Sequence, residues 1–418
     1  MKIACMVDEY PPYFLGGLGT YAMELSRQFV RMGHEITVFS RNSGDDPPRG
    51  IWEGTEVYRP YLMNFTGVLP IVVPPDVRKW SPRGQEFFQE TLHYNFMAAS
   101  TLVNQIVRVD GRSFDIVVAH DWLSAMAGIM AKRNLNLPFV FHFHASERGR
   151  TGNGSETVKE IERIAAFEAD RIITVSYAMR DELVRQGVRE KDIRVVYNGV
   201  DTRKYRPDRY SADEIQAIKE EIGVGSHPMI LYVGRLTWTK GVDSLIRAMP
   251  IILASVPDAK LVILGRGEEE QLLGHLVLCQ CADAVILNLS YVEEEERIRY
   301  YAACDVAVFP SKYEPFGIAA TEAMAMGKPV VVGGRGTSGM REQVICAGRH
   351  ACGFHINPND PQDIAKFTVR LLKDADLRKV VGRAARKRVE EHFTWDLCAQ
   401  RTLDVYREAI EMHRRKQQ

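Results

Sequence analysis

The sequence predicts an α/β protein with two open parallel sheets, and three observations support this prediction. Short apolar runs alternate with amphipathic segments along the chain, as in parallel strands that are joined by helices. This alternation stops near residue 203 and starts again at residue 229. A chain of 418 residues, of which 45% are hydrophobic and 26% charged, is also long enough for two domains with separate cores.

We therefore expect a first domain at residues 1–203 and a second domain at residues 204–395. A turn at Asn198-Gly199, followed by a proline and a charged stretch, marks the boundary between them. The last segment, residues 396–418, has a helical pattern and a charged end, and we expect it to pack back on the first domain.

The first βαβ unit illustrates the pattern. Residues 3–7 form an apolar run, which predicts a strand, and a loop with prolines and glycines follows. The next apolar residues recur at the spacing of one helix face: Leu18, Ala22, Leu25, Phe29 and Met32. Gly33 ends this helix, and residues 35–39 give the second strand.

The same pattern predicts the remaining strands. In the first domain these are residues 116–119, 139–143, 172–175 and 194–197. In the second domain they are residues 229–233, 261–264, 285–287, 306–309 and 330–332. Residues 60–95 carry five prolines and many aromatic residues, and we interpret them as an insertion over one face of the first domain.

Composition excludes several classes of protein. Lys+Arg and Asp+Glu are both 54, so there is no basic excess of the kind that nucleic-acid binders show. The seven cysteines include no C-x-x-C pair, which favours unpaired thiols in a reducing compartment. There is neither an apolar run of transmembrane length nor a signal peptide, and we expect a cytoplasmic protein without integral membrane association.

Two open parallel sheets place the chemistry on particular loops. Ligands of such sheets bind outside the carboxyl ends of the strands, where the strand order reverses. If the two sheets face each other, the loops that follow their strands line one deep cleft. The loops that directly follow the predicted strands are therefore where we expect the site.

The loop after the first strand contains Gly16, Gly17 and Gly19 at the start of a helix. Glycine lets the backbone approach a phosphate, and the helix N-terminus supplies free N–H groups. The spacing differs from the dinucleotide motif G-x-G-x-x-G, and a plain tight turn is the alternative interpretation.

The second domain opens with a strand and then Gly234-Arg235-Leu236-Thr237-Trp238-Thr239-Lys240-Gly241. Two cations five residues apart suit a diphosphate, because arginine binds it as a fork and lysine as a point charge. A solvated loop is the alternative, and the glycine loop in the first domain makes it less attractive.

The strongest motif follows the strand at 306–309. Glu314 lies in a loop and Glu322 lies eight residues later in the next helix, whose start offers the backbone N–H groups of Phe316, Gly317 and Ile318. Carboxylates accept hydrogen bonds from hydroxyl groups. Two carboxylates at this spacing are suited to two polyols, a sugar and a ribose.

These motifs together resemble one family. The stretch from Glu314 to Glu322 is similar to the E-x7-E motif of retaining glycosyltransferases of family four, which have the GT-B fold of two Rossmann-like domains. Arg235 and Lys240 match the diphosphate pair of that family, and Gly16-Gly17 matches its first glycine loop. Two further stretches look like the family: residues 169–176 and 196–201.

Within the family, the first domain resembles glycogen and starch synthases. His120-Asp121-Trp122 follows a strand, as in those enzymes, and residues 141–144 lead into the loop 145–150. The resemblance implies that His144 contacts the transferred sugar and that His120 and Asp121 face the acceptor. The first glycine loop departs from bacterial synthases, which have a longer signature with a lysine. The resemblance therefore supports the type of reaction more than the identity of the donor and the acceptor.

The resemblance implies transfer of a hexose, with glucose as our first choice, from a nucleotide-diphosphate sugar such as ADP-glucose or UDP-glucose to an α-glucan. Configuration would be retained, and no further cofactor is expected. Glu322 would bind the ribose, Glu314 and the Phe316–Ile318 amides the hexose, and Arg235 and Lys240 the diphosphate. His144 and the Gly17 loop would come from the first domain, and base recognition is expected near Tyr291.

We expect no metal. The only Asp-x-Asp triplet, Asp374 to Asp376, lies in a helical charged stretch, where a helix end or a surface role explains it. Arg235, Lys240 and helix dipoles would instead neutralise the leaving diphosphate.

Other interpretations stay open. The acceptor could be a small sugar or a lipid-linked molecule, although the helix after the first glycine loop has only Arg27 and Arg31 as cations for a membrane surface. A sugar-nucleotide epimerase of the same fold is a third interpretation, which the Glu314–Glu322 motif disfavours.

Overall fold

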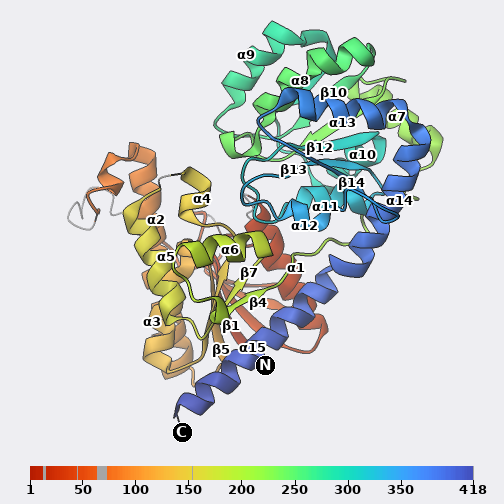
Figure 1. Cartoon of the computed structure of the whole chain (residues 1–418). Coiled ribbons are helices and arrows are strands. Elements are labelled where there is room, and N and C mark those ends of the chain that lie inside the picture. The colour runs from red at the N-terminus through yellow and green to blue at the C-terminus, as the bar shows by residue number, and fades with distance from the viewer. Residues whose placement is uncertain (13–15, 45, 64–72, 153, 418) are drawn as a thin grey trace. The chain divides into compact units, whose positions relative to one another are not determined.

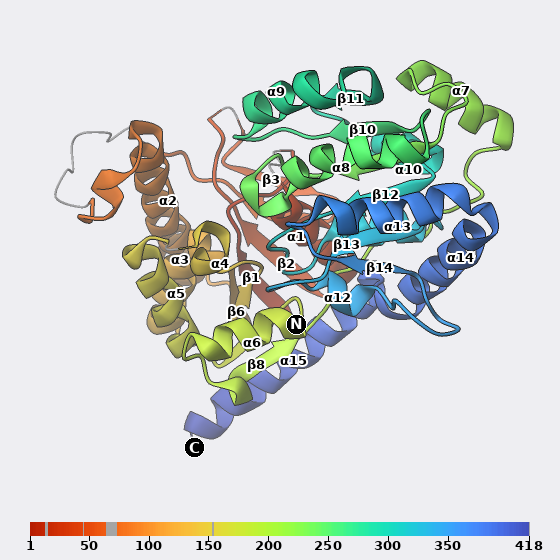
Figure 2. The same cartoon turned by 45° about the horizontal axis from the view of Figure 1, so that its top comes forward.

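The computed structural model describes the whole chain except residues 13–15, 45, 64–72, 153 and 418. It contains two compact units. Unit 1 is formed by Met1–Tyr197 together with Trp395–Gln418, and unit 2 is Asn198–Thr394. Each unit is a mainly parallel sheet with helices on its faces (Figures 1 and 2), so the predicted α/β class is confirmed.

The described part of unit 1 contains a sheet of eight strands in the order β3-β4-β2-β1-β5-β6-β7-β8. All neighbours are parallel except β3 and β4, which form a hairpin. The central strands β1, β5 and β6 are buried on both faces, which explains their continuous apolar runs. The strands are β1 (Lys2–Met6), β2 (Glu35–Phe39), β3 (Arg49–Trp52), β4 (Thr55–Tyr58), β5 (Ile116–His120), β6 (Phe139–Phe143), β7 (Arg171–Thr174) and β8 (Ile193–Val195).

Helices cover both faces of this sheet. Helix α15 at the end of the chain packs beside α1 and contacts β7, whereas α3 packs against both α2 and α5. Ser146, Ser155 and Ser176 each accept a backbone N–H at the start of a helix, which stabilises that end. The helices are α1 (Gly17–Arg31), α2 (Pro82–Ser100), α3 (Asp121–Leu135), α4 (Glu147–Thr151), α5 (Glu156–Glu168), α6 (Tyr177–Arg185) and α15 (Trp395–Gln417).

The interpretation of residues 60–95 as an insertion is wrong for their second half. Residues 82–95 belong to helix α2, which connects β4 to β5 in the ordinary way and packs on α3. Pro82 occupies the first turn, where a proline costs no hydrogen bond. The aromatic residues form a cluster with α3 and α5, made of Val73, Val77, Phe88, Trp122 and Val158. Residues 64–72 lie outside the described residues.

Unit 2 contains, in its described residues, a sheet of six parallel strands in the order β11-β10-β9-β12-β13-β14. The strands are β9 (Met229–Val233), β10 (Lys260–Leu264), β11 (Val285–Asn288), β12 (Val306–Phe309), β13 (Val330–Gly333) and β14 (Gly353–Ile356). The helices are α7 (Ala212–Ile222), α8 (Val242–Ser255), α9 (Glu270–Gln280), α10 (Glu294–Ala303), α11 (Ile318–Ala325), α12 (Met340–Gln343), α13 (Pro361–Lys373) and α14 (Ala375–His392). Helices α8 and α13 lie side by side (Figure 2).

In both sheets the order of the strands reverses at one point. In unit 2 the order runs outward from β9 to β10 on one side and from β12 to β13 on the other. In unit 1 the corresponding neighbours are β1 and β5. Crevices at such points hold the ligands of open α/β sheets. Among the described residues, no helix combines the length and the apolar composition that crossing a membrane requires.

Candidate active site

In unit 2 the loops after β9 and β12 are packed directly on each other. The backbone N–H of Lys312 donates to the carbonyl of Thr239 at 2.7 Å. Gly241 has a φ of +65°, and a Cβ there would lie 2.2 Å from the carbonyl oxygen of Pro310. Only glycine is compatible with this backbone and this approach. The loop with the predicted diphosphate residues and the loop with the predicted hexose residue are therefore held in fixed positions relative to each other.

An ion pair joins these loops. The Nζ of Lys240 lies 2.5 Å from Oε2 of Glu314, and both side chains are more than four-fifths buried. The hydroxyl of Ser311 also donates to Oε2, at 3.3 Å. The other oxygen of Glu314, Oε1, accepts no hydrogen bond within the part of the chain that the structure describes. Glu314 is thus held by one oxygen and presents the second.

Arg235 lies on the same loop after β9 as Lys240, and its side chain is exposed. It forms no ion pair with any residue that the structure describes, in contrast to Lys240. A guanidinium without an internal partner keeps its five donors for a ligand. The loop therefore carries two cations five residues apart: Lys240, whose charge is balanced by Glu314, and Arg235, whose charge is not balanced by a described residue.

The backbone around Glu314 is fixed from the loop after β13. Its N–H donates to Thr337 at 3.0 Å, and its carbonyl accepts from Gly339 at 2.8 Å. Helix α11 then begins after Gly317, which has a φ of +97° and no room for a Cβ beside Met340. The first turn of α11, with Ile318, directs unpaired N–H groups out of the helix start. Phe316 itself is buried against Phe393.

Glu322, the second glutamate of the motif, lies inside unit 2. Its Oε1 accepts from the hydroxyl of Tyr205 at 3.0 Å, and Oε2 accepts from Tyr301 at 2.9 Å. Arg297 lies 3.5 Å from Oε1, and the carboxylate of Glu322 holds the pKa of this arginine above its usual range. Oε2 keeps one lone pair for a further donor. Sequence reasoning missed these partners, because they lie on α10 and in the segment before α7.

Tyr291 follows the outer strand β11 and is 63% exposed, so its ring is accessible. Asp374, considered above as part of a metal motif, accepts the backbone N–H of Leu377 at 2.8 Å and caps helix α14. A helix end thus accounts for that residue.

In unit 1, Gly17 is the first residue of α1. Gly16 precedes it with extended backbone, and a Cβ there would meet no atom of the described residues within 4 Å. A helix N-terminus favours an anion, because its first N–H groups have no partner within the helix. Phe14 and Leu15 of the same loop lie outside the described residues.

Asp121 anchors the loop of His144. Its Oδ1 accepts the backbone N–H of His144 at 2.7 Å and that of Ala145 at 3.3 Å. Asp121 has a φ of +53°, a strained conformation for a residue with a side chain. Asp121 and His120 are both buried, and their hydrogen bonds are made inside unit 1. That they face the acceptor stays a prediction. Trp122 stacks on Phe88 in the core.

Three histidines gather at the ends of β5 and β6: His120, His142 and His144. One ring nitrogen of each lies within 4.8 Å of the others, a spacing that could hold a metal ion. Burial lowers the pKa of all three, so they are neutral at pH 7. Sequence reasoning singled out His120 and His144, but not the partners Cys5, Tyr21 and Tyr406.

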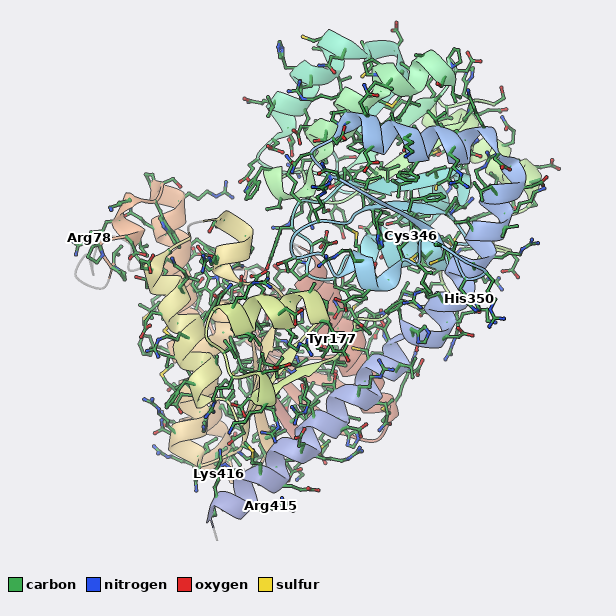
Figure 3. All side chains as sticks on the ribbon, viewed as in Figure 1. Arg78, Tyr177, Cys346, His350, Arg415 and Lys416 are labelled. Carbon is green, nitrogen blue, oxygen red and sulfur yellow. The ribbon has the colours of Figure 1, made fainter. Side chains whose placement is uncertain are left out.

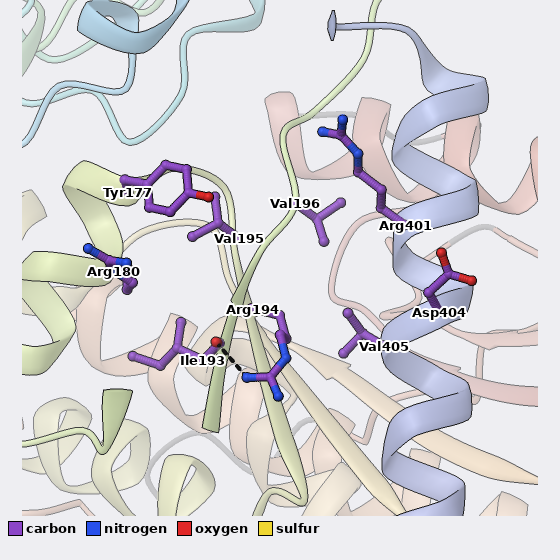
Figure 4. A pocket seen from close by; sticks show the side chains of 9 residues that line it. All are labelled: Tyr177, Arg180, Ile193, Arg194, Val195, Val196, Arg401, Asp404 and Val405. Atoms are coloured by element: carbon purple, nitrogen blue, oxygen red, sulfur yellow. Dashed lines mark hydrogen bonds between the residues drawn. The ribbon is translucent and has the colours of Figure 1, made fainter. Parts of the chain in front are cut away.

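Unit 1 also has a cavity of about 340 Å³ beside the outer strand β8, between α6 and α15 (Figure 4). Tyr177, which Figure 3 labels at the start of α6, lines it together with three arginines. Two of these are already paired: Arg180 with Asp181 at 2.7 Å, and Arg194 with Glu408. Since most of its charge is compensated, we assign no ligand to this cavity.

Glu162 makes the stability of unit 1 depend on pH. Its carboxylate accepts the N–H of Glu147 at 2.9 Å, and burial raises its pKa from 4.5 to about 8 although Arg150 lies 3.9 Å away. The folded protein therefore holds a proton that the unfolded chain loses. This contribution to stability is complete below pH 4.5 and is lost as the pH rises to about 8.

We expect the melting temperature to fall over this pH range, and the Glu162→Gln variant to show a smaller fall. The difference should correspond to at least about 1 kcal/mol, since one pKa unit is worth about 1.4 kcal/mol. Thermal unfolding at several pH values measures it. Glu160→Gln on the exposed face of α5 is the control, because Arg163 lowers the pKa of that residue. Equal slopes for the wild type and Glu162→Gln would contradict the assignment.

Two family models match most of the chain. Residues 15–204 match the family model described as Glycosyltransferase Family 4, and residues 214–388 match Glycosyl transferases group 1. The chain is 34% identical to an uncharacterised glycosyltransferase of Methanocaldococcus jannaschii, over 99% of each chain. It is 30% identical to the glycogen synthase of Mycobacterium tuberculosis, covering 97% of this chain and 94% of that protein.

Solved structures are similar over nearly the whole chain. Sucrose-phosphate synthase from Thermosynechococcus elongatus superposes with a TM-score of 0.79 at 23% identity, covering 98% of this chain and 99% of that one. The catalytic domain of starch synthase IV from Arabidopsis thaliana, bound to ADP and acarbose, gives 0.75 at 19% identity with the same coverage. At these identities the likeness concerns the fold.

Proposed function

The chain is a member of glycosyltransferase family 4 with the GT-B fold, and from this premise we propose that it transfers a hexose from a nucleotide-diphosphate sugar to an α-glucan with retention of configuration. The hexose we propose is glucose. One observation carries the proposal: the Lys240–Glu314 ion pair joins the loops after β9 and β12, where the strand order of unit 2 reverses, and the uncompensated Arg235 lies on the first of these loops. Cations for a diphosphate and a carboxylate for hydroxyl groups are thus held in one place.

The relatives support this choice of donor and acceptor. A glycogen synthase covers nearly the whole chain at 30% identity. Structures of the same fold were solved with UDP and glucose and with ADP and acarbose. The ligands and activities given for these proteins support a nucleotide sugar that carries glucose as the donor and a glucan as the acceptor.

In unit 2 we assign the donor to the described contacts. Arg235 and Lys240 bind the diphosphate, and the open oxygen of Glu314 accepts from the hexose together with the first N–H groups of α11. Glu322 accepts from the ribose through the lone pair that Oε2 keeps. Tyr291 marks the region of the base.

Two features of unit 1 complete the assignment. The helix N-terminus at Gly17 favours a negatively charged part of the donor. The anchored loop after β6 presents His144, which binds a hydroxyl group of the transferred sugar.

Leaving-group stabilisation is the main catalytic term in this proposal. Negative charge grows on the diphosphate as the glycosidic bond lengthens, and Arg235 and Lys240 act most strongly on that charge. Oδ1 of Asp121 accepts two backbone N–H groups, which lowers the nucleophilicity of this carboxylate. We therefore propose departure and attack on the same face of the sugar.

Activity should not depend on a divalent metal, because the two side-chain cations supply the charge that a metal would supply on the diphosphate. We expect initial rates after treatment with a chelator to stay within about twofold of the untreated protein. The control is the chelator saturated with magnesium. Loss of activity that added metal restores would contradict this expectation.

A phosphorylated small acceptor is the second candidate. The chain is 28% identical to an α-maltose-1-phosphate synthase of Mycolicibacterium smegmatis and 29% identical to a D-inositol 3-phosphate glycosyltransferase of Xylanimonas cellulosilytica. A lipid-linked acceptor and epimerisation of the free nucleotide sugar are the remaining alternatives.

A panel of nucleotide sugars decides between them. Each is incubated with glycogen, with glucose 1-phosphate, with inositol phosphate, with a lipid-linked sugar and without acceptor, and the release of nucleoside diphosphate and the products are measured. We expect transfer of glucose to glycogen with α-linked product. Transfer to a sugar phosphate alone would establish the second candidate, and interconversion of nucleotide sugars without transfer would overturn the proposal.

A further inference from the structure

We propose that Cys5 and His120 form a hydrogen-bond relay that fixes the tautomer of His144, so that His144 offers its Nδ1–H to a hydroxyl oxygen of the transferred sugar. Cys5 and His120 are positioning residues in this proposal. The relay itself is independent of the proposed function, and only the last contact, to the sugar, rests on it.

The three side chains come from neighbouring strands. Cys5 lies on β1, His120 ends β5, and His144 follows β6 directly. The Sγ of Cys5 lies 3.5 Å from Nε2 of His120, and Nδ1 of His120 lies 3.0 Å from Nε2 of His144. Cys5 and His120 are at most 4% exposed, so water does not compete for these bonds.

Burial determines the protonation of each group. It lowers the pKa of His120 and of His144, and it raises the pKa of the Cys5 thiol to about 12. At neutral pH the thiol therefore keeps its proton, and each imidazole carries one N–H. The proton between the two rings can then belong either to His120 or to His144.

The thiol selects between these arrangements. A thiol is a weak donor and a weak acceptor, whereas an imidazole nitrogen is a good acceptor. If the thiol donates to Nε2 of His120, the S–H of Cys5 and the Nδ1–H of His120 both meet an imidazole nitrogen. In the reverse arrangement, His144 would donate from Nε2 to His120, and His120 would donate from Nε2 to the sulfur of Cys5. The sulfur is a weak acceptor, and the thiol proton would then have no imidazole acceptor. His120 therefore donates from Nδ1 to Nε2 of His144, and the proton of His144 lies on Nδ1.

Other contacts hold the ring of His144 without using its nitrogens. The ring of Tyr21 packs edge-on at 4.5 Å, and Asp121 holds the backbone N–H of His144. Nδ1 of His144 makes no hydrogen bond to any residue that the structure describes. It thus remains a donor with a defined direction, as recognition of a hydroxyl oxygen requires.

His142 provides an internal comparison. It is buried beside the relay, but its nitrogens bond to the hydroxyls of Tyr21, at 3.4 Å, and Tyr406, at 3.0 Å. Tyr406→Phe therefore removes a buried hydrogen bond of the same cluster without touching the relay. It is the matched control for loss of stability alone.

The tautomer is measured on the full-length protein with ¹⁵N-labelled histidine at neutral pH, from the two-bond couplings of the ring nitrogens. The chain has 11 histidines, and the resonance that disappears in His144→Gln assigns His144. We expect the Nδ1–H tautomer in the wild type. Cys5→Ser and His120→Asn keep a donor at the required place and should preserve it, whereas Cys5→Ala and His120→Leu should yield a mixture with the Nε2–H form.

Kinetics with the substrates found in the acceptor panel give the second readout. We expect kcat to fall about 10- to 100-fold in His120→Leu, the usual range when an orienting partner is lost, and to recover in large part in His120→Asn. The KM of the donor should change less, and Tyr406→Phe should leave kcat within about twofold even if its melting temperature falls.

The relay is overturned if His144 carries its proton on Nε2 in the wild type, or if Cys5→Ala and His120→Leu leave its tautomer unchanged. A changed tautomer with unchanged kcat would support the relay and overturn the role of His144 in the proposed function. The two failures are therefore distinguishable.

Discussion

Replacement of Arg235 by alanine is expected to lower kcat by about 100-fold or more, in the range seen when one preorganised donor to a developing oxyanion is removed. Charge on the leaving diphosphate is largest in the transition state, so kcat should fall more than donor binding. Because Arg235 is exposed and has no ion-pair partner among the described residues, its loss should leave the melting temperature nearly unchanged. Steady-state kinetics with saturating acceptor measure the effect.

Lys240 needs a different variant because of its ion pair. Alanine would leave the buried carboxylate of Glu314 without its partner, so Lys240→Met, which keeps the length of the side chain, is the better test. We expect a similar loss of kcat with a measurable loss of stability. Lys312→Met is the matched control, since Lys312 lies on the adjoining loop after β12, near Glu314, and pairs with Asp243 at 3.1 Å. Turnover close to that of the wild type in both Arg235→Ala and Lys240→Met would refute the diphosphate assignment.

The fold could be predicted where burial dictates the pattern. Central strands such as β1, β5 and β9 are apolar on both faces, so each reads as an apolar run between turn residues. The hairpin of β3 and β4 escaped prediction, because these strands have four residues each and β3 is half-exposed. Helix α2 was obscured by the prolines before it and by aromatic residues on several of its sides.

The candidate site shows a similar division. Glu314, Arg235 and Lys240 could be proposed from the sequence, because a ligand site of this fold requires polar or charged residues directly after the strands. Arg235 and Lys240 lie on one loop and Glu314 on another, and each loop follows a predicted strand. The ion pair between two of them could not, since it joins loops 74 residues apart. It depends on the adjacency of β9 and β12, which the chain order does not state.

The relay was invisible for another reason. Cys5 looks like any small buried residue of a strand, and nothing near it in the sequence points to a histidine 115 residues away. Tyr406 is likewise a buried residue of a long helix until that helix is placed beside β6 and β7. Such partners follow from strand order and helix docking, and therefore only from the structure.

The two glutamates of the motif should respond differently to the same substitution. Glu314→Gln is expected to lower kcat about 10- to 100-fold, because its open oxygen lies at the proposed hexose site, where positive charge develops on the ring. Glu322→Gln is expected mainly to raise the donor KM, since the ribose does not change during the reaction. It should also lower the melting temperature, because Arg297 loses its buried counter-charge.

Two further variants separate these roles from structural ones. Tyr205→Phe removes one hydrogen bond to Glu322 and leaves the charge of Glu322 unchanged. It therefore measures the loss of stability from a weakened Glu322 cluster while the proposed contact of Glu322 with the ribose is kept. For Glu314, the double variant Lys240→Met/Glu314→Gln tests whether the glutamate acts only by holding the lysine. If it does, the double variant is no slower than Lys240→Met alone, and non-additivity equals the whole effect of Glu314→Gln. If Glu314 also acts on the sugar, the double variant is slower than either single variant. The roles assigned to the two glutamates would be contradicted if Glu314→Gln and Glu322→Gln changed kcat and KM in the same way.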